Sequence, residues 1–118
     1  MLMRLYHNPH CSKSRATLAL LQDRGIEAEL CLYLQNPPDH EELRELLRLL
    51  GIGPRDLMRK GEKEYRDHNL ADLADRALTD AELIDALHRF PQLIERPILV
   101  AGDQARIGRP PESVIDII

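Results

Sequence analysis

The sequence has no tryptophan and few other aromatic residues, namely three tyrosines and one phenylalanine. Proteins that bind single-stranded nucleic acid stack its bases on aromatic side chains, and this chain lacks the residues for such a platform. Its formal net charge of −4 also disfavours attraction to a phosphate backbone. We therefore expect no nucleic-acid partner.

Long apolar runs are absent as well, and the only cysteines are Cys11 and Cys31. No segment approaches the roughly 20 apolar residues that a membrane-spanning helix needs, and the N-terminus has no signal-peptide hydrophobic region. Two cysteines in 118 residues are too few for a disulfide framework, so free or redox-active thiols are expected. We predict a single domain over residues 1–118, cytoplasmic and without a membrane partner.

The first third of the chain has the pattern of a strand, a helix and a second strand. Residues 2–7 and 26–34 are the predicted strands, and the helix runs from Ser12 to about Arg24. Within residues 26–34, the even-numbered positions are apolar and alternate with Glu, Cys and Tyr. This order implies parallel strands joined by a right-handed crossover.

The middle of the chain is predicted to be helical. Capping-box pairs open helices at Asp39 and Thr79, and Gly53-Pro54 opens a shorter one. Residues 60–69 are polar and irregular, which indicates a surface loop or a frayed turn.

The last third predicts a β-hairpin and a final helix. Residues 97–101 and 104–107 form antiparallel strands around the turn Gly102-Asp103, and a short helix follows Pro111. The complete order is β-α-β, a helical insertion, then β-β-α. This is the order of an α/β, thioredoxin-like fold with a mixed sheet.

Cys11 lies where the first strand gives way to the first helix. A thiol there is near the positive end of the helix dipole and near unpaired backbone N–H groups, which favours the nucleophilic thiolate. Lys13 and Arg15 add positive charge nearby. The alternative is that Cys11 is a small buried hydrophobic residue, as free cysteines commonly are. His7, His10 and Cys11 could suggest a zinc site, but no Cys-x-x-Cys or paired histidines elsewhere in the sequence complete it, so we expect no metal.

The residues that follow Cys11 exclude two related chemistries. Ser14 stands where thioredoxin-like proteins carry the second cysteine of Cys-x-x-Cys; it can donate a hydrogen bond to a thiolate but cannot resolve a mixed disulfide. A tyrosine-phosphatase loop needs arginine where Thr17 stands. Reduction at Cys11 therefore needs a thiol from outside, such as glutathione, or from Cys31, which we interpret as structural.

Three arginines lie at the boundaries of predicted elements, namely Arg59, Arg96 and Arg109. The planar guanidinium binds tetrahedral oxyanions through two parallel hydrogen bonds, although solvation at the surface is the alternative for any single arginine. Arg96 and Arg109 each precede a proline. Pro97 stands where thioredoxin-like folds carry a cis-proline opposite the cysteine.

In this order and at these separations, the segments resemble the glutaredoxin-coupled arsenate reductase family along essentially the whole chain. The segments that carry the resemblance are Tyr6-His7-Asn8-Pro9 through Arg15, Tyr33-Leu34 with Pro37-Pro38, Leu57-Met58-Arg59-Lys60, Ile94 through Ile98, and Gly108-Arg109-Pro110. The resemblance implies that Cys11 is the catalytic nucleophile and that His7 assists it; Ser14 joins them as the hydrogen-bond donor to the thiolate described above. It also implies that Arg59, Arg96 and Arg109 bind the oxyanion.

The resemblance further implies a reaction and its partners. Cys11 would form a covalent adduct with arsenate, glutathione would attack the adduct and release arsenite, and glutaredoxin would reduce the remaining disulfide, with no bound cofactor. One alternative is a glutathione-dependent thiol oxidoreductase that acts on another small substrate. A second, in a different class, is an Spx-like regulator that binds RNA polymerase, although Ser14 removes the Cys-x-x-Cys switch usual in that family.

Overall fold

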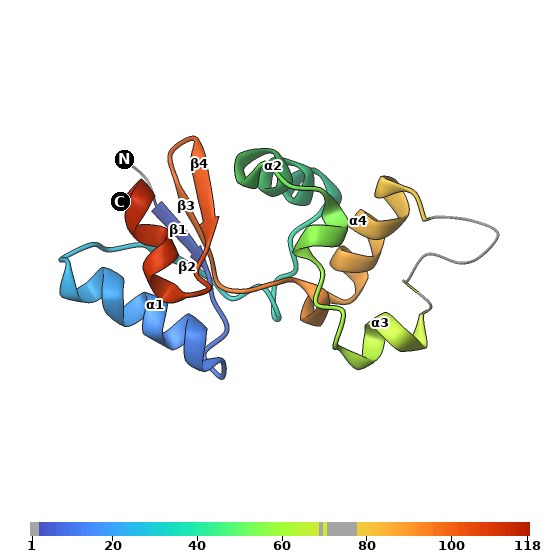
Figure 1. Cartoon of the computed structure of the whole chain (residues 1–118), viewed down its shortest axis with the longest axis horizontal. Coiled ribbons are helices and arrows are strands. Elements are labelled where there is room, and N and C mark those ends of the chain that lie inside the picture. Colours follow the sequence, from blue (N-terminus) through green and yellow to red (C-terminus); the bar gives the residue numbers. More distant parts are fainter. Residues whose placement is uncertain (1–2, 69, 71–77) are drawn as a thin grey trace. The chain divides into compact units, whose positions relative to one another are not determined.

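The computed structural model describes residues 3–68, 70 and 78–118. The chain divides into two compact units, one formed by Met1–Asn36 with Arg96–Ile118 and the other by Pro37–Glu95. The first unit contains a β-sheet and the second is helical (Figure 1). The single domain expected over residues 1–118 stays a prediction.

The first unit is built on a four-stranded sheet in the order β2-β1-β3-β4. β1 (Met3–Tyr6) pairs in parallel with β2 (Glu29–Cys31), and helix α1 (Ser12–Asp23) makes the crossover between them. β1 also pairs with β3 (Ile98–Ala101), and β3 with β4 (Gln104–Ile107), both antiparallel. The predicted α/β class, mixed sheet and C-terminal hairpin are therefore confirmed.

The core of the first unit joins the sheet to α1 and to the last helix, η3 (Pro111–Ile117). Leu5 and Leu99 are partners in register on neighbouring strands, so their side chains point to the same face. The buried residues of this cluster are Leu5, Leu99 and Ala101 from the sheet, Leu21 from α1, and Val114 and Ile117 from η3. Each fully buried leucine contributes about 1.5–3 kcal/mol relative to an exposed one, so this cluster anchors α1 on the sheet.

The second strand is shorter than the sequence predicts, and its alternation is misleading. β2 has three residues instead of the predicted 26–34, because the chain turns at Leu32, whose carbonyl accepts two later N–H groups. Leu30 and Leu34 are 45% and 40% exposed, whereas Tyr33 is 1% exposed. β2 is one of the two edge strands of the sheet, so its apolar residues are not all buried in the core.

The second unit packs helix α2 (His40–Leu50) against helix α4 (Asp80–Arg89). The short helices η1 (Pro54–Leu57), α3 (Lys63–Asp67) and η2 (Pro91–Leu93) complete it. Among the described residues, its fully or nearly buried leucines and isoleucines are Leu43, Leu46, Leu47, Leu57, Leu70, Leu83, Ile84, Leu87, Leu93 and Ile94.

The predicted helix starts of the second unit are confirmed. The Asp39 carboxylate accepts the Glu42 N–H at 2.8 Å, which satisfies one free donor at the start of α2. Thr79 and Glu82 form a reciprocal capping box at the start of α4. These contacts are local in sequence, which is why the pattern alone located them.

Helix α3 corrects the prediction of a loop or frayed turn over residues 60–69, of which residue 69 lies outside the described residues. The helix buries none of its side chains, so it has no apolar stripe that would reveal it in the sequence. Lys63 Nζ and Asp67 Oδ2, one turn apart, lie 2.6 Å from each other. Such an exposed pair stabilises a helix only weakly, so it is a weak signal in the sequence.

Candidate functional site

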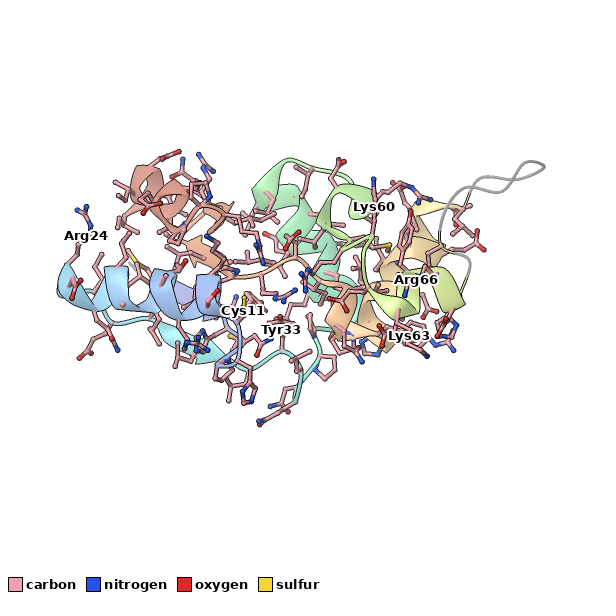
Figure 2. The ribbon with its side chains drawn as sticks, turned by 60° about the horizontal axis from the view of Figure 1, so that its bottom comes forward. Cys11, Arg24, Tyr33, Lys60, Lys63 and Arg66 are labelled. Atoms are coloured by element: carbon pink, nitrogen blue, oxygen red, sulfur yellow. The ribbon has the colours of Figure 1, made fainter. Side chains whose placement is uncertain are left out.

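Cys11 is the N-cap residue of α1, as the sequence predicts (Figure 2). Its backbone is extended (φ −96°, ψ 124°), and its carbonyl accepts the Arg15 N–H at 3.0 Å. The thiol therefore lies at the positive end of the helix dipole, among first-turn N–H groups without helical partners. The residue is also only 8% exposed, so burial, which the alternative interpretation expects, is present at the same position.

Buried hydrogen bonds join the loop before Cys11 to the first turn of α1. Ser14 Oγ lies 2.6 Å from His7 Nδ1 and accepts the Asn8 N–H at 3.0 Å. His7 is 5% exposed and Ser14 fully buried. Two proton arrangements satisfy these distances. Either Ser14 donates to a bare His7 Nδ1, or a protonated Nδ1 donates to Ser14 and leaves the hydroxyl hydrogen free. Only the second allows the predicted hydrogen bond from Ser14 to the Cys11 sulfur, and that bond stays a prediction.

Burial lowers the pKa of His7, and the positive charge of Arg15 lowers it further. Arg15 is held against this loop because its Nη1 donates to the Pro9 carbonyl at 3.0 Å. At neutral pH the His7 ring is therefore neutral. A neutral imidazole in a hydrogen-bonded pair with Ser14 can accept a proton and release it again.

The two Arg-Pro segments lie side by side at one end of the β3-β4 hairpin. Arg96-Pro97 leads into β3 and Arg109-Pro110 follows β4, and both peptide bonds are cis. The cis bond predicted at Pro97 is confirmed, whereas the one at Pro110 was not foreseen. Gly108 N–H donates to the Pro97 carbonyl at 2.9 Å, and Arg109 Nε donates to the Arg96 carbonyl at 2.9 Å. The structure thus brings Arg96 and Arg109 together.

Gly108 connects this end of the hairpin to α1. A Cβ atom on Gly108 would lie 2.6 Å from Thr17 Oγ1 and 2.9 Å from Pro97 Cγ, closer than real Cβ contacts allow. Thr17 is fully buried, and its hydroxyl donates to the Lys13 carbonyl at 2.9 Å. The segment that carries Arg109 therefore packs against the helix whose N-terminus carries Cys11. The sequence carries no signal for this contact beyond the glycine directly before Arg109.

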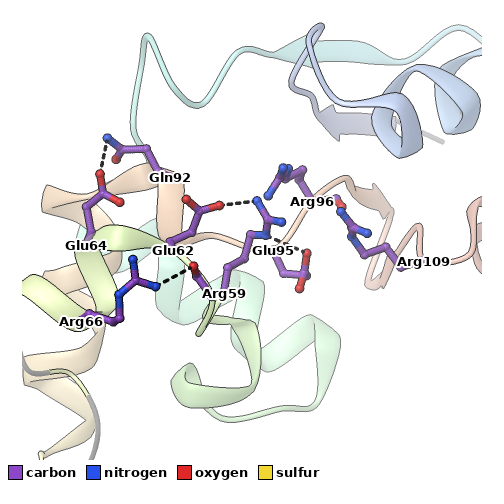
Figure 3. A network of polar contacts seen from close by, with 9 residues as sticks. Arg59, Glu62, Glu64, Arg66, Gln92, Glu95, Arg96 and Arg109 are labelled. Atoms are coloured by element: carbon purple, nitrogen blue, oxygen red, sulfur yellow. Dashed lines mark hydrogen bonds and ion pairs between the residues drawn. The ribbon is translucent and has the colours of Figure 1, made fainter.

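Arg59 belongs to the second unit, whereas Cys11, Arg96 and Arg109 belong to the first. Its Nη1 donates to Glu62 Oε1 at 2.7 Å, and its Nε lies 3.5 Å from Glu95 Oε1 (Figure 3). Sequence reasoning identified the arginine but neither carboxylate. That Arg59 acts in the same site as Cys11 stays a prediction.

Three general properties complete the description. Both cysteines are free thiols. Across residues 3–68, 70 and 78–118, no helix has the length and apolar character needed to cross a bilayer. Within the same ranges, no group of three or more His, Cys, Asp or Glu side chains is arranged to hold a metal ion.

A mixed sheet, a cysteine at the N-cap of the crossover helix and a cis-proline before β3 define a thioredoxin-like protein. The model of the ArsC family matches residues 6–117. The chain is 48% identical over 115 residues to an arsenate reductase of Haemophilus influenzae, covering 97% of each chain. It is 50% identical over 117 residues to YfgD of Escherichia coli strain K12, an uncharacterized protein, covering 98% of this chain and 96% of YfgD.

A solved structure agrees with these sequence matches. The arsenate reductase from Vibrio cholerae is 47% identical and superposes with a TM-score of 0.94, covering 100% of this chain and 98% of that one. The chain belongs to the ArsC family.

Proposed function

We propose that this protein is an arsenate reductase whose nucleophile is Cys11. The observation that carries the proposal is the placement of Cys11 at the N-terminus of α1, in the same unit as the paired Arg96 and Arg109 segments. The thiol supplies a nucleophile and the two guanidinium groups supply oxyanion-binding donors. The names of the Haemophilus and Vibrio relatives support arsenate as the oxyanion.

In the first step, the Cys11 thiolate attacks the arsenic atom of arsenate. One arsenate oxygen leaves as water after protonation, and an S–As bond forms with arsenic still at As(V). Two anions meet in this step, so the helix N-terminus, Arg96 and Arg109 offset their repulsion and stabilise the charge on the arsenate oxygens. Arg59 is the third proposed oxyanion-binding residue.

In the second step, a glutathione thiolate attacks the Cys11 sulfur. The S–As bond breaks with its electron pair on arsenic, so As(V) becomes As(III), and arsenite leaves. Two thiols have become one mixed disulfide, which balances the two electrons. Because Ser14 stands in the place of a resolving cysteine, an external thiol, which we propose to be glutaredoxin, returns Cys11 to the thiol.

His7 and Ser14 manage the proton of the Cys11 thiol in this scheme. The His7 ring is kept neutral by burial and by Arg15, which lower its pKa, so it can take up a proton before the attack. Ser14, which is bonded to His7 Nδ1, fixes the orientation of the ring.

A coupled assay tests the proposal. The protein is incubated with arsenate, glutathione, glutaredoxin and an NADPH-linked recycling system, in parallel with the Cys11→Ser variant. We expect arsenate-dependent NADPH oxidation with the native protein but not with the Cys11→Ser variant. An oxidation rate no higher than that of the variant would contradict the proposal. Replacing glutathione and glutaredoxin by thioredoxin and its reductase should abolish turnover, and full activity with thioredoxin would show that the proposed electron donor is wrong.

A further inference from the structure

The guanidinium of Arg59 is held between two carboxylates of the second unit (Figure 3). The hydrogen bond from Nη1 to Glu62 Oε1 is 2.7 Å long, whereas Nε and Glu95 Oε1 are 3.5 Å apart. The side chains of Arg59, Glu62 and Glu95 are 25%, 31% and 27% exposed, so water screens the three charges only in part. Together they carry a net charge of −1, which opposes the approach of an anion.

Main-chain hydrogen bonds position the carboxylates of Glu62 and Glu95 near Arg59. Arg59 N–H donates to the Leu93 carbonyl at 2.7 Å, and Glu95 N–H donates to the Leu57 carbonyl at 2.8 Å, so the two segments run antiparallel. Glu95 lies opposite Leu57, two residues before Arg59, and therefore on the same face as the arginine. Glu62 N–H donates to the Arg59 carbonyl at 3.3 Å, which closes a turn and returns Glu62 to the arginine. The arrangement is therefore fixed by main-chain hydrogen bonds.

These contacts restrict the binding of an oxyanion. A guanidinium offers two edges with parallel donors, one formed by Nε and Nη2 and the other by Nη1 and Nη2. Glu95 Oε1 lies 3.5 Å from Nε, a nitrogen of the first edge, and Glu62 Oε1 accepts from Nη1, a nitrogen of the second edge. An oxyanion that binds either edge through two hydrogen bonds therefore meets a carboxylate next to one of its two donor nitrogens. The Glu62 contact has the short distance of a strong charge-assisted bond, and the Glu95 contact does not.

We propose that Glu62 competes with the oxyanion substrate for the Nη1–Nη2 edge of Arg59 and swings away when the oxyanion binds. This inference rests on the proposed function, in which Arg59 contacts the oxyanion. The competition lowers the affinity for every anion. An anion that forms two parallel hydrogen bonds displaces the carboxylate more readily than one that forms a single contact. Glu62 is thus a residue that sets the affinity and selectivity of the oxyanion site.

Calorimetric titration with sulfate, an unreactive tetrahedral dianion, tests the competition. All variants carry Cys11→Ser, so that no covalent chemistry contributes. We expect Glu62→Gln to bind sulfate about two- to fivefold more tightly, since a partly exposed ion pair contributes up to about 1 kcal/mol. Glu64→Gln is the matched control, because it removes the same charge from a carboxylate whose neighbour is Gln92 at 3.5 Å. Its sulfate affinity should not change.

The Arg59→Ala variant separates failure of this inference from failure of the proposed function. If Arg59→Ala leaves sulfate affinity unchanged, Arg59 does not bind the oxyanion. That result would refute both the proposed role of Arg59 and the competition by Glu62. If Arg59→Ala weakens binding but Glu62→Gln does not tighten it, Arg59 keeps its role and the competition is refuted. A loss of affinity in Glu62→Gln would show that Glu62 only positions the arginine. In the Arg59→Ala background the tightening must disappear, and tightening that persists there would overturn the inference.

Discussion

Replacing Gly108 by alanine should destabilise the protein, because there is no space for a methyl group between α1 and the hairpin. The added Cβ would lie 2.6 Å from Thr17 Oγ1 and 2.9 Å from Pro97 Cγ. Thr17 is buried and its hydroxyl is bonded to Lys13, so it does not move aside freely. Overpacking of this kind costs about 1–3 kcal/mol.

The unfolded state partly offsets this cost. Gly108 is not among the glycines with positive φ, so alanine is compatible with its backbone and gains about 0.4–1 kcal/mol from the reduced entropy of the unfolded chain. Two contacts below 3.0 Å place the overpacking cost at about 2–3 kcal/mol, so we expect a net loss of about 1–2.5 kcal/mol in the free energy of unfolding. Urea denaturation followed by circular dichroism measures it as a lower midpoint with an unchanged slope.

Two further variants identify the cause. In the Thr17→Ala background the cost of Gly108→Ala should shrink by about 0.5 kcal/mol or more, because the closest clashing atom is gone while the Pro97 contact remains. Gly61→Ala is the matched control, since a Cβ there meets nothing within 4 Å, and its stability should be unchanged or slightly higher. The packing argument would be refuted if Gly108→Ala were as stable as the native protein, or if its cost were the same with and without the Thr17→Ala substitution.

Two other predictions concern charge in the proposed site. The lowered pKa of His7 means that the unfolded state binds more protons below the ordinary value of about 6.5, so stability should fall as pH drops from 7 to 5. His7→Asn should make the decline shallower, and an identical pH profile would show that His7 does not contribute. Arg109→Lys should lower kcat/KM for arsenate about tenfold or more, since a lysine ammonium cannot make the two parallel hydrogen bonds of a guanidinium. A loss of stability as large as the loss of activity would mark Arg109 as structural.

The parts of the fold that the sequence predicts well depend on local signals. Gly25, with φ 71°, stands one residue beyond the C-cap of α1, close to the predicted end of that helix, and Gly102, with φ 64°, stands in the predicted turn of the hairpin. The capping contacts at Asp39 and Thr79 are likewise made within three residues along the chain. Each of these features is decided by neighbours in sequence and needs no knowledge of the tertiary structure.

The parts that the sequence does not predict depend on the approach of distant segments. The exposure of Leu30 follows from the position of β2 at the edge of the sheet, which the strand pattern does not contain. The contact between Gly108 and Thr17 joins residues that are far apart in the chain. The same is true of Glu95, which reaches Arg59 only because their backbone segments pair. Residue types at the candidate site are therefore easier to predict than their partners.

Arg96 and Arg109 show how much a local signal can determine at a distance. The Gly102-Asp103 turn sets a register in which Ala101 pairs with Gln104 and Ile98 with Ile107. Beyond the last pair of the ladder, the Gly108 N–H donates to the Pro97 carbonyl and Arg109 Nε donates to the Arg96 carbonyl, both at 2.9 Å, so the two Arg-Pro segments stay together past the ends of the strands. A slip of one residue would turn the β4 side chains to the opposite face and remove the hydrogen bond between the Arg109 guanidinium and the Arg96 carbonyl. A turn of two residues thus determines that the Arg96 and Arg109 segments lie together. The position of Arg59 has no such local determinant.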